Sequence, residues 1–230
     1  MKYLFLLTLL FTLTAQAKTL RVAIVDTGLD LSDERFSEHL CPEGHKDFSA
    51  SGIKDTVGHG TFIAGLIQKY AGKGNYCFLV YKYYSENAPG FVNVENEVSA
   101  LREAVNSGAT IVNFSAGGSI FDEQEYLIIK TNPQITFVVA AGNEGKNLDL
   151  SKNKYYPASY FLKNEVIVAN VDSNGKRSVR SNWSDKAVEE VGENVKSTMP
   201  NYATGYMTGT SMSTAVRTGK IIRKTLDAAK

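Results

Sequence analysis

"NVENEVSALREAVNSGATIVNFS", residues 93–115, joins a helix pattern to a strand pattern without a break. The first part carries apolar residues at helical spacing: Val94, Val98, Leu101 and Val105. The pattern ends at Gly108, and the run ATIVNFS that follows is nearly continuous in apolar residues. Such a run is typical of a strand that is buried on both faces of a parallel sheet. This stretch therefore predicts a helix that leads directly into a buried strand.

The same alternation extends in both directions along the chain. Four more strand patterns are LRVAIVD (20–26), YCFLVYKYY (76–84), ITFVVAAG (135–142) and EVIVANVD (165–172). Three more helix patterns cover residues 58–70, 122–130 and 212–230. Strands that alternate with helices indicate an α/β fold of three layers, with a mainly parallel central sheet and helices on both faces. Ligands of such folds bind beyond the carboxyl ends of the strands.

The first 17 residues have the layout of a secretory signal peptide. Lys2 precedes an apolar run over residues 4–13, and Ala15 and Ala17 provide a small-residue cleavage site. A membrane anchor is the alternative, but the run is shorter than the roughly 20 apolar residues that span a bilayer. We expect cleavage after Ala17, a single domain over residues 18–230, a secreted or periplasmic location, and no membrane attachment after cleavage.

Charge and cysteine content narrow the class of partners and the compartment. The formal net charge is +1, so nothing favours nucleic acid as a partner. The chain has two cysteines, Cys41 and Cys77, and in an exported protein they predict a disulfide. Two buried free thiols are the alternative.

Four polar residues stand at predicted strand ends or at a helix start. They are Asp26 in VAIVDTGLD, His59 in VGHGTFIAG, Asn143 in VVAAGNEG and Ser211 in TGTSMSTA. Each has a structural alternative: a turn aspartate, a hydrogen-bonded histidine, an asparagine in a left-handed turn, or an N-cap serine. Together they supply a nucleophile, a general base, a group that orients the base and an amide donor for an oxyanion. Acyl transfer of this kind needs no cofactor or metal, and we expect neither.

With NFSAGG (113–118) added, these motifs resemble the subtilisin-like serine proteases, or subtilases. The order Asp, His, Asn, Ser along the chain distinguishes this family from chymotrypsin-like enzymes and from α/β-hydrolases. The resemblance implies a subtilisin-like fold and a secreted serine endopeptidase that acts on polypeptides. It also implies a catalytic triad of Asp26, His59 and Ser211. Asn143 and the backbone N–H of Ser211 would then hold the oxyanion.

The resemblance further implies a substrate-binding set: Phe114, Ser115, Ala116, Gly117, Gly142 and Tyr155. Residues 114–118 match the family's extended segment, which pairs with the substrate backbone and forms a wall of the S1 pocket. Tyr155 stands where small residues are frequent in the family. We therefore expect a shallow S1 pocket that disfavours large P1 side chains.

Some features depart from the family pattern. Only residues 18–25 separate the predicted cleavage point from Asp26, which leaves no room for a folding propeptide, so we expect a compact variant that folds unaided or with a partner. Phe62 replaces a second histidine, and Ala215 and Val216 replace a Pro-His pair. The chain has no carboxylate cluster with calcium-loop spacing, so the sequence does not support the metal sites of the family.

Three other functions compete with a protease. The first is a catalytically silent subtilase-like domain that binds peptides, a partner protein or an inhibitor. The second is a nucleotide-binding enzyme, but neither G-x-x-x-x-G-K-[ST] nor G-x-G-x-x-G after the first strand is present. The third is a metal site of His39, Glu43 and His45, whose spacing matches no specific pattern.

Overall fold

The computed structural model describes residues 19–229, and a seven-stranded parallel sheet lies at its centre. The strand order is β2-β3-β1-β4-β5-β6-β7. The strands are β1 (Leu20–Asp26), β2 (Lys46–Asp47), β3 (Tyr76–Lys82), β4 (Ile111–Phe114), β5 (Thr136–Ala140), β6 (Glu165–Val171) and β7 (Val188–Val191). All five predicted strand patterns form strands of this sheet, and LRVAIVD forms β1 residue for residue.

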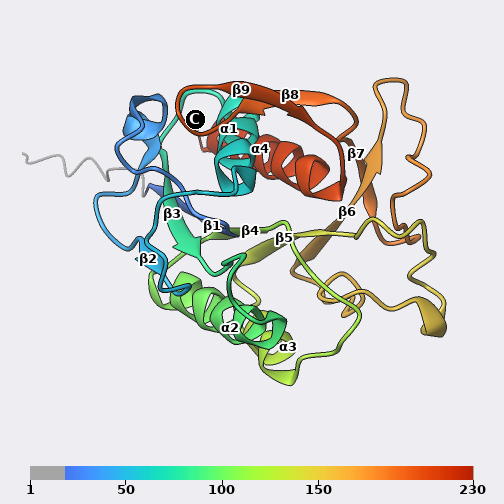
Figure 1. Cartoon of the computed structure of the whole chain (residues 1–230). Coiled ribbons are helices and arrows are strands. Elements are labelled where there is room, and N and C mark those ends of the chain that lie inside the picture. The colour runs from blue at the N-terminus through green and yellow to red at the C-terminus, as the bar shows by residue number, and fades with distance from the viewer. Residues whose placement is uncertain (1–18, 230) are drawn as a thin grey trace, which may run out of the picture.

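Helices cover both faces of the sheet. They are α1 (His59–Ala71), α2 (Gly90–Asn106), α3 (Glu123–Lys130) and α4 (Thr210–Ala228), with short 3₁₀ helices at Glu34–His39 and Ser151–Asn153. In the view of Figure 1, α1 and α4 lie above the sheet and α2 and α3 lie below it. The predicted three-layer α/β fold is thus confirmed.

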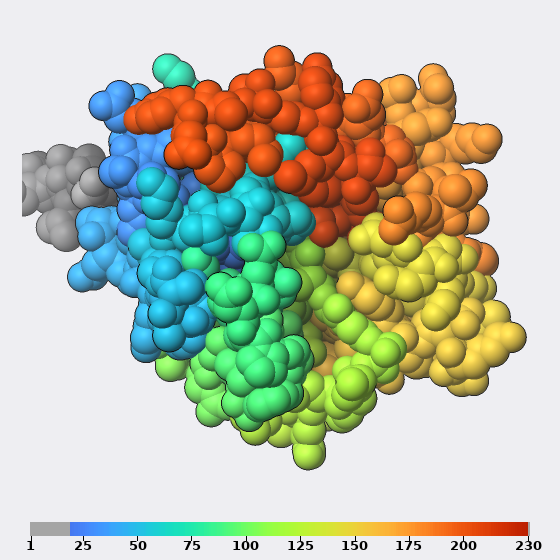
Figure 2. All heavy atoms as spheres, viewed as in Figure 1, coloured from blue at the N-terminus to red at the C-terminus, as the bar shows by residue number. Residues whose placement is uncertain are grey.

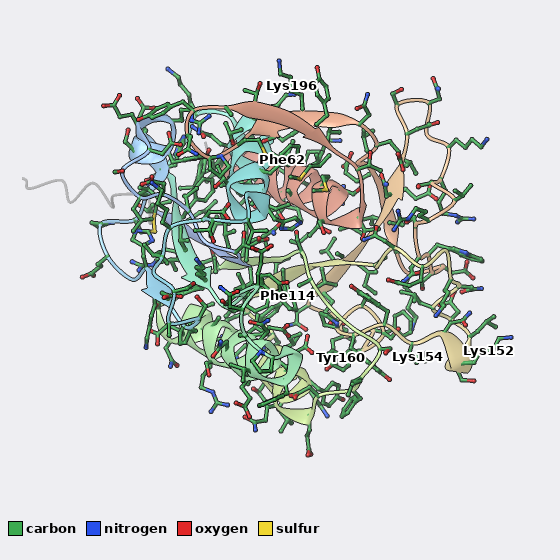
Figure 3. All side chains as sticks on the ribbon, in the orientation of Figure 1. Phe62, Phe114, Lys152, Lys154, Tyr160 and Lys196 are labelled. Atoms are coloured by element: carbon green, nitrogen blue, oxygen red, sulfur yellow. A yellow bond between two sulfur atoms is a disulfide. The ribbon has the colours of Figure 1, made fainter. Side chains whose placement is uncertain are left out.

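The nearly continuous apolar runs reflect burial on both faces. Val22 and Ile24 of β1 belong to the core under α1 and α4, whereas Ala23 and Val25 belong to the core over α2. Successive strand residues point to opposite faces, so a strand covered on both sides must be apolar throughout. Figure 3 shows Phe62 in the upper layer, and Phe114 lies in the lower core.

The sheet topology brings the polar strand ends together. β1 pairs with β3 on one side and with β4 on the other, and Val25 is in register with Phe114. Asp26, the next residue of β1, therefore lies beside Ser115, the next residue after β4. β5 pairs with β4 on the far side, which brings the segment 141–143 to the same edge.

An antiparallel hairpin, β8 (Val195–Thr198) and β9 (Thr204–Met207), packs over the start of α1. The Ser197 and Thr198 hydroxyls donate to the carbonyls of Phe62 and Thr61 at 2.8 and 2.9 Å. The sequence patterns did not predict this hairpin, β2 or β7. These strands are short, and β7 has the polar sequence VEEV.

The predicted disulfide is present between Cys41 and Cys77, and it ties the loop after the first 3₁₀ helix to β3. The predicted signal peptide, residues 1–17, lies outside the described residues. Within residues 19–229, no helix has both the length and the hydropathy to cross a membrane.

Candidate active site

Asp26 and His59 form a hydrogen-bonded pair at the carboxyl end of β1. His59 Nδ1 lies 2.7 Å from Asp26 Oδ1, and the same oxygen accepts the Thr27 backbone N–H at 2.8 Å. Asp26 is 4% exposed and the His59 side chain 27% exposed. Burial alone would lower the pKa of His59, but the charge and hydrogen bond of Asp26 outweigh it and raise this pKa above its usual value. Asp26 is thus more than a turn residue, and one ring nitrogen of His59 is fixed while the other is left for chemistry.

Asp55, which lies in none of the motifs named from the sequence, organises the loop that leads into α1. This carboxylate is 2% exposed and accepts the backbone N–H groups of Val57, Gly58 and Thr61 at 2.7–3.0 Å. It also accepts the Thr27 hydroxyl at 2.9 Å, which joins the loop to the residue after Asp26. The available signal was an aspartate four residues before His59, at the position where carboxylates satisfy the free N–H groups of a helix start.

Close approach of the two segments requires a glycine after His59. A Cβ atom at Gly60 would lie 2.3 Å from the Gly28 carbonyl oxygen and 3.3 Å from Asp26 Oδ1. The first of these distances is a clash with backbone. The Gly-His-Gly sequence therefore allows α1 to start directly against the end of β1.

Ser211 is the second residue of α4 and does not cap the helix. The N-cap is Gly209, and no side chain caps this end. Ser211 Oγ instead donates to the Ser115 carbonyl at 2.9 Å, and Ser115 Oγ donates to the Ser211 carbonyl at 3.1 Å. These reciprocal bonds hold Ser211 beside the end of β4, the strand that pairs with β1.

Asn143 lies against the same helix start with a defined amide orientation. Its Oδ1 accepts the Thr210 backbone N–H at 3.0 Å and the Thr210 hydroxyl at 3.2 Å. A backbone N–H can only donate, so the oxygen faces Thr210 and the amide NH₂ points elsewhere. Asn143 is absent from the residues with positive φ, so it does not occupy a left-handed turn.

The Ser211 backbone N–H is the remaining amide of this first turn. The N–H of Thr210 is taken by Asn143, and those of Met212 and Ser213 are taken by the Gly209 carbonyl. In the described part of the chain, the Ser211 N–H has no acceptor. A free helix N-terminal amide beside an amide side chain makes a site suited to an oxyanion.

A buried series of side-chain hydrogen bonds supports the segment that contains Ser211. Thr218 Oγ1 donates to Asn113 Oδ1 at 2.8 Å, and Asn113 Nδ2 donates to Ser115 Oγ at 3.0 Å. Thr218 and Asn113 are fully buried. This network links α4 to β4 and fixes Ser115, the residue that contacts Ser211.

The residues that were expected to bind substrate differ in whether a substrate can reach them. Phe114 has no exposed surface, and its ring packs on Tyr83 in the lower core, so its side chain cannot contact a substrate. Residues 115–118 run beyond the end of β4, and Gly118 pairs with Tyr156 through two backbone hydrogen bonds of 2.9 and 2.6 Å.

The Tyr155 ring fills the space between Gly117 and Gly142. A Cβ atom built on Gly117 would lie 2.7 Å from Tyr155 Cε1, and one built on Gly142 would lie 3.0 Å from Tyr155 Cδ2. The structure therefore brings Gly117, Gly142 and Tyr155 together, with the phenol ring between the other two.

The other two histidines are held by structural contacts. The His39 ring stacks on Tyr76 with centroids 4.0 Å apart. His45 is bonded through both ring nitrogens, at 2.8 Å to the Cys41 carbonyl and at 3.1 Å to the Val80 N–H. Within residues 19–229, no group of three or more His, Cys, Asp or Glu side chains is arranged to hold a metal ion.

Comparison with known proteins identifies the family. The family model described as "Subtilase family" matches residues 17–223. This match covers most of the chain, so the chain belongs to the subtilase family.

Relatives and solved structures agree with this assignment. The chain is 30% identical over 216 residues to the major intracellular serine protease of Bacillus subtilis (strain 168), covering 86% of this chain and 66% of that protein. It is 26% identical over 206 residues to the cell wall-associated protease of the same organism, covering 84% of this chain and 22% of that protein. The crystal structure of a lanthipeptide protease superposes with a TM-score of 0.78 at 21% identity, covering 91% of this chain and 73% of that one, and supports the fold. The chain thus spans less than two thirds of the length of these two curated relatives.

Proposed function

We propose that this chain is a serine endopeptidase that hydrolyses peptide bonds through an acyl-enzyme on Ser211. The observation that carries the proposal is the hydrogen bond of 2.7 Å between His59 Nδ1 and Asp26 Oδ1. This pair lies at the carboxyl end of β1, and the Ser115–Ser211 contact lies at the end of β4, the neighbouring strand. His59 takes the Ser211 proton and later gives it to the leaving amine, while Asp26 holds the imidazole in orientation and stabilises its charged form. Membership in the subtilase family supports the same roles.

The oxyanion donors in this proposal are Asn143 and the Ser211 backbone N–H. Both lie at the start of α4, where the helix dipole also favours negative charge. The Asn143 oxygen is occupied by Thr210, so its NH₂ group is the end available to a developing oxyanion. For a subtilisin, a member of this family, loss of the asparagine donor costs about 10²–10³ in turnover, and loss of the serine roughly 10⁶. We expect a loss of turnover of the first size in Asn143→Ala and of the second size in Ser211→Ala.

Substrate binding would release the nucleophile from its resting contact. The Ser211 hydroxyl has one hydrogen, and in the free protein it is directed at the Ser115 carbonyl. An extended substrate that pairs with residues 115–118 would offer its own backbone N–H to that carbonyl. The Ser211 hydroxyl would then be free to rotate and donate to His59.

We further propose that the protein is exported as a single catalytic domain, residues 18–230, with a shallow S1 pocket closed by Tyr155. The Cys41–Cys77 disulfide supports an oxidising compartment. N-terminal sequencing of the protein from culture fluid and periplasm would test export, and a chain that retains Met1 inside the cell would contradict it.

The proposed activity is tested with a fluorophosphonate probe. We expect one covalent adduct on Ser211 of the folded protein and hydrolysis of a denatured protein substrate. Ser211→Ala should abolish both, whereas Asn143→Ala should keep weak turnover. A folded protein that binds peptides but takes no label on Ser211 would instead be a silent binding domain.

A further inference from the structure

A groove of about 750 Å³ lies beside residues 117–120, which follow Ser115, the residue that contacts Ser211. One wall is the first half of α2, and the other is formed by residues 117–120 and the start of α3. In Figure 2, these walls are the green surface of α2 and the strip of yellow-green atoms after β4, with a hollow between them. The groove therefore continues the path of a substrate that pairs with residues 115–118.

The rim of the groove is apolar and exposed. Phe91, Val94 and Ile120 all line it, and they are 69%, 44% and 84% exposed. Exposed apolar side chains gathered around a concave surface indicate a binding site, because they gain free energy when a ligand covers them.

The groove also contains a buried carboxylate whose hydrogen bonds are incomplete. Glu125 lines the groove and is 4% exposed. Its Oε1 has no hydrogen-bond partner, and its Oε2 accepts only from the Tyr160 hydroxyl at 3.0 Å. That hydroxyl also lies 2.9 Å from the Asp122 carbonyl, and its single hydrogen can serve only one acceptor fully. Figure 3 shows Tyr160 in the lower layer of the molecule, close to α3.

A second carboxylate, Glu97 of α2, lines the same groove. Burial and the negative charge of Glu125 raise the pKa of Glu97, and burial raises the pKa of Glu125 to about 7. Among the described residues, neither carboxylate takes part in an ion pair. Ionisation of these two desolvated acids is costly without a cation, so they retain their protons more readily in the free protein, and a cation that entered the groove would stabilise the charged forms.

We propose that this groove binds a lysine or arginine side chain of the polypeptide substrate, with its cation between Glu97 and Glu125. The aliphatic stem of such a side chain would cover the apolar rim, and only its charged end would reach the carboxylates. This inference rests on the proposed function, because it assumes that residues 115–118 pair with the substrate.

The register of the segment gives the position of the basic residue in the substrate. Ser115 contacts the nucleophile, and residues 117–119 form the groove wall. Paired strands match residue for residue, so the basic residue belongs roughly two to four positions before the P1 residue.

The test measures binding to Ser211→Ala protein, so that hydrolysis does not interfere. Fluorescein-labelled peptides carry lysine, arginine or norleucine at each position before the scissile bond in turn, and fluorescence anisotropy gives their Kd values. A charge-assisted contact of the usual strength predicts that lysine binds roughly 10- to 100-fold more tightly than norleucine at one position in this window.

The variants separate the carboxylates from general surface charge. Glu97→Gln with Glu125→Gln should reduce the preference for lysine to within about threefold, since the shape is kept and the charge is lost. Glu123→Gln removes an exposed charge from the same helix as Glu125 and should leave the preference unchanged. Thermal melts of each variant check that the fold is retained.

Two results would overturn the inference: norleucine binding as tightly as lysine at every position, or a preference for lysine that survives loss of both carboxylates. Fluorophosphonate labelling of Ser211 in the unmutated protein reports on the protease function separately. A labelled enzyme without a lysine preference refutes only the groove assignment. A preference for lysine in a protein that is never labelled refutes only the protease.

Discussion

Replacement of Tyr155 by glycine should change the P1 preference of the proposed protease from small residues to aromatic ones. The Tyr155 ring lies within contact distance of both Gly117 and Gly142, the glycines expected to line the S1 pocket. The Tyr155 hydroxyl makes no hydrogen bond among the described residues, so the ring acts by filling space. Tyr155→Gly empties that space without adding a group that could contact the substrate.

The size of the effect follows from what the vacated space can hold. A P1 phenylalanine that takes the place of the Tyr155 ring would bury an aromatic side chain of nearly the same size. Full burial of a phenylalanine side chain contributes roughly 1.5–3 kcal/mol, which corresponds to about 10- to 150-fold in kcat/KM. A P1 alanine gains little from the larger pocket, so the ratio of Phe to Ala should rise by that factor.

The assay compares two peptides that differ only at P1, alanine against phenylalanine, and normalises the rates to the amount of enzyme that a fluorophosphonate probe titrates. Tyr155→Phe is the matched control, because it keeps the ring and should keep the wild-type preference. Best cleavage after Phe or Tyr by the wild-type enzyme would refute the reasoning. A Phe-to-Ala ratio that changes by less than about threefold in Tyr155→Gly would refute it as well.

Three other consequences can be measured. Replacing Cys41 and Cys77 by serine should cost about 4 kcal/mol, since the crosslinked residues are 36 apart in sequence, and should lower Tm by roughly 8–16 °C; coincident melts of oxidised and reduced protein would argue against this. Burial raises the pKa of Glu165 to about 8, so the folded state favours the protonated acid and stability is lost as pH rises from about 4.5 through 8. Glu165→Gln should therefore match the wild type near pH 4 and be more stable by on the order of 5 kcal/mol near pH 9, whereas an equal gain at both pH values in urea unfolding would contradict this assignment. Finally, kcat/KM should rise with pH through a His59 pKa above the usual value of about 6.5, because the base must be neutral, and a pH profile that falls over this range would exclude His59 as the base.

The sheet could be predicted from sequence where both faces of a strand are buried. β1 and β3 are apolar in nearly every residue, so their sequences admit few alternatives. β7 could not be predicted, because its sequence VEEV looks like exposed loop. In the fold, Glu190 of β7 is 6% exposed and is paired with Lys220 of α4 at 2.7 Å. The cation that stabilises this carboxylate at a buried position is distant in sequence.

The residues of the candidate site likewise divide into those that could be predicted from sequence and those that could not. Asp26, His59, Asn143 and Ser211 could be named from sequence because each lies in a short motif at the end of a strand or the start of a helix. Asp55 belongs to no such motif, because its role consists of hydrogen bonds to backbone groups that only the folded loop brings together.

The groove carboxylates were hidden for a different reason. Glu97 and Glu125 lie on separate helices, and each follows other polar residues, which suggests a solvated helix face. Their burial results from packing of α2 against α3 and the segment after β4. Residues that are assembled in this way leave no local pattern, so substrate preference is harder to predict from sequence than reaction chemistry.

Discrimination between substrates should affect kcat as well as KM, because in the proposed mechanism residues 115–119 contact both the substrate and Ser211. Ser115 holds the Ser211 hydroxyl through its carbonyl, and residues 117–119 form the wall between the Tyr155 ring and the groove. A peptide that fits both sites aligns with the segment and takes the Ser115 carbonyl, which frees Ser211 to donate to His59. When a bound peptide fits neither the pocket at Tyr155 nor the groove, the Ser211 hydroxyl stays in contact with the Ser115 carbonyl for more of the time. Binding energy far from the scissile bond is then expressed in the chemical step. Single-turnover rates at saturating peptide should therefore fall when the basic residue is replaced by norleucine; a change confined to KM would show that the hydroxyl contact with Ser115 does not limit the reaction.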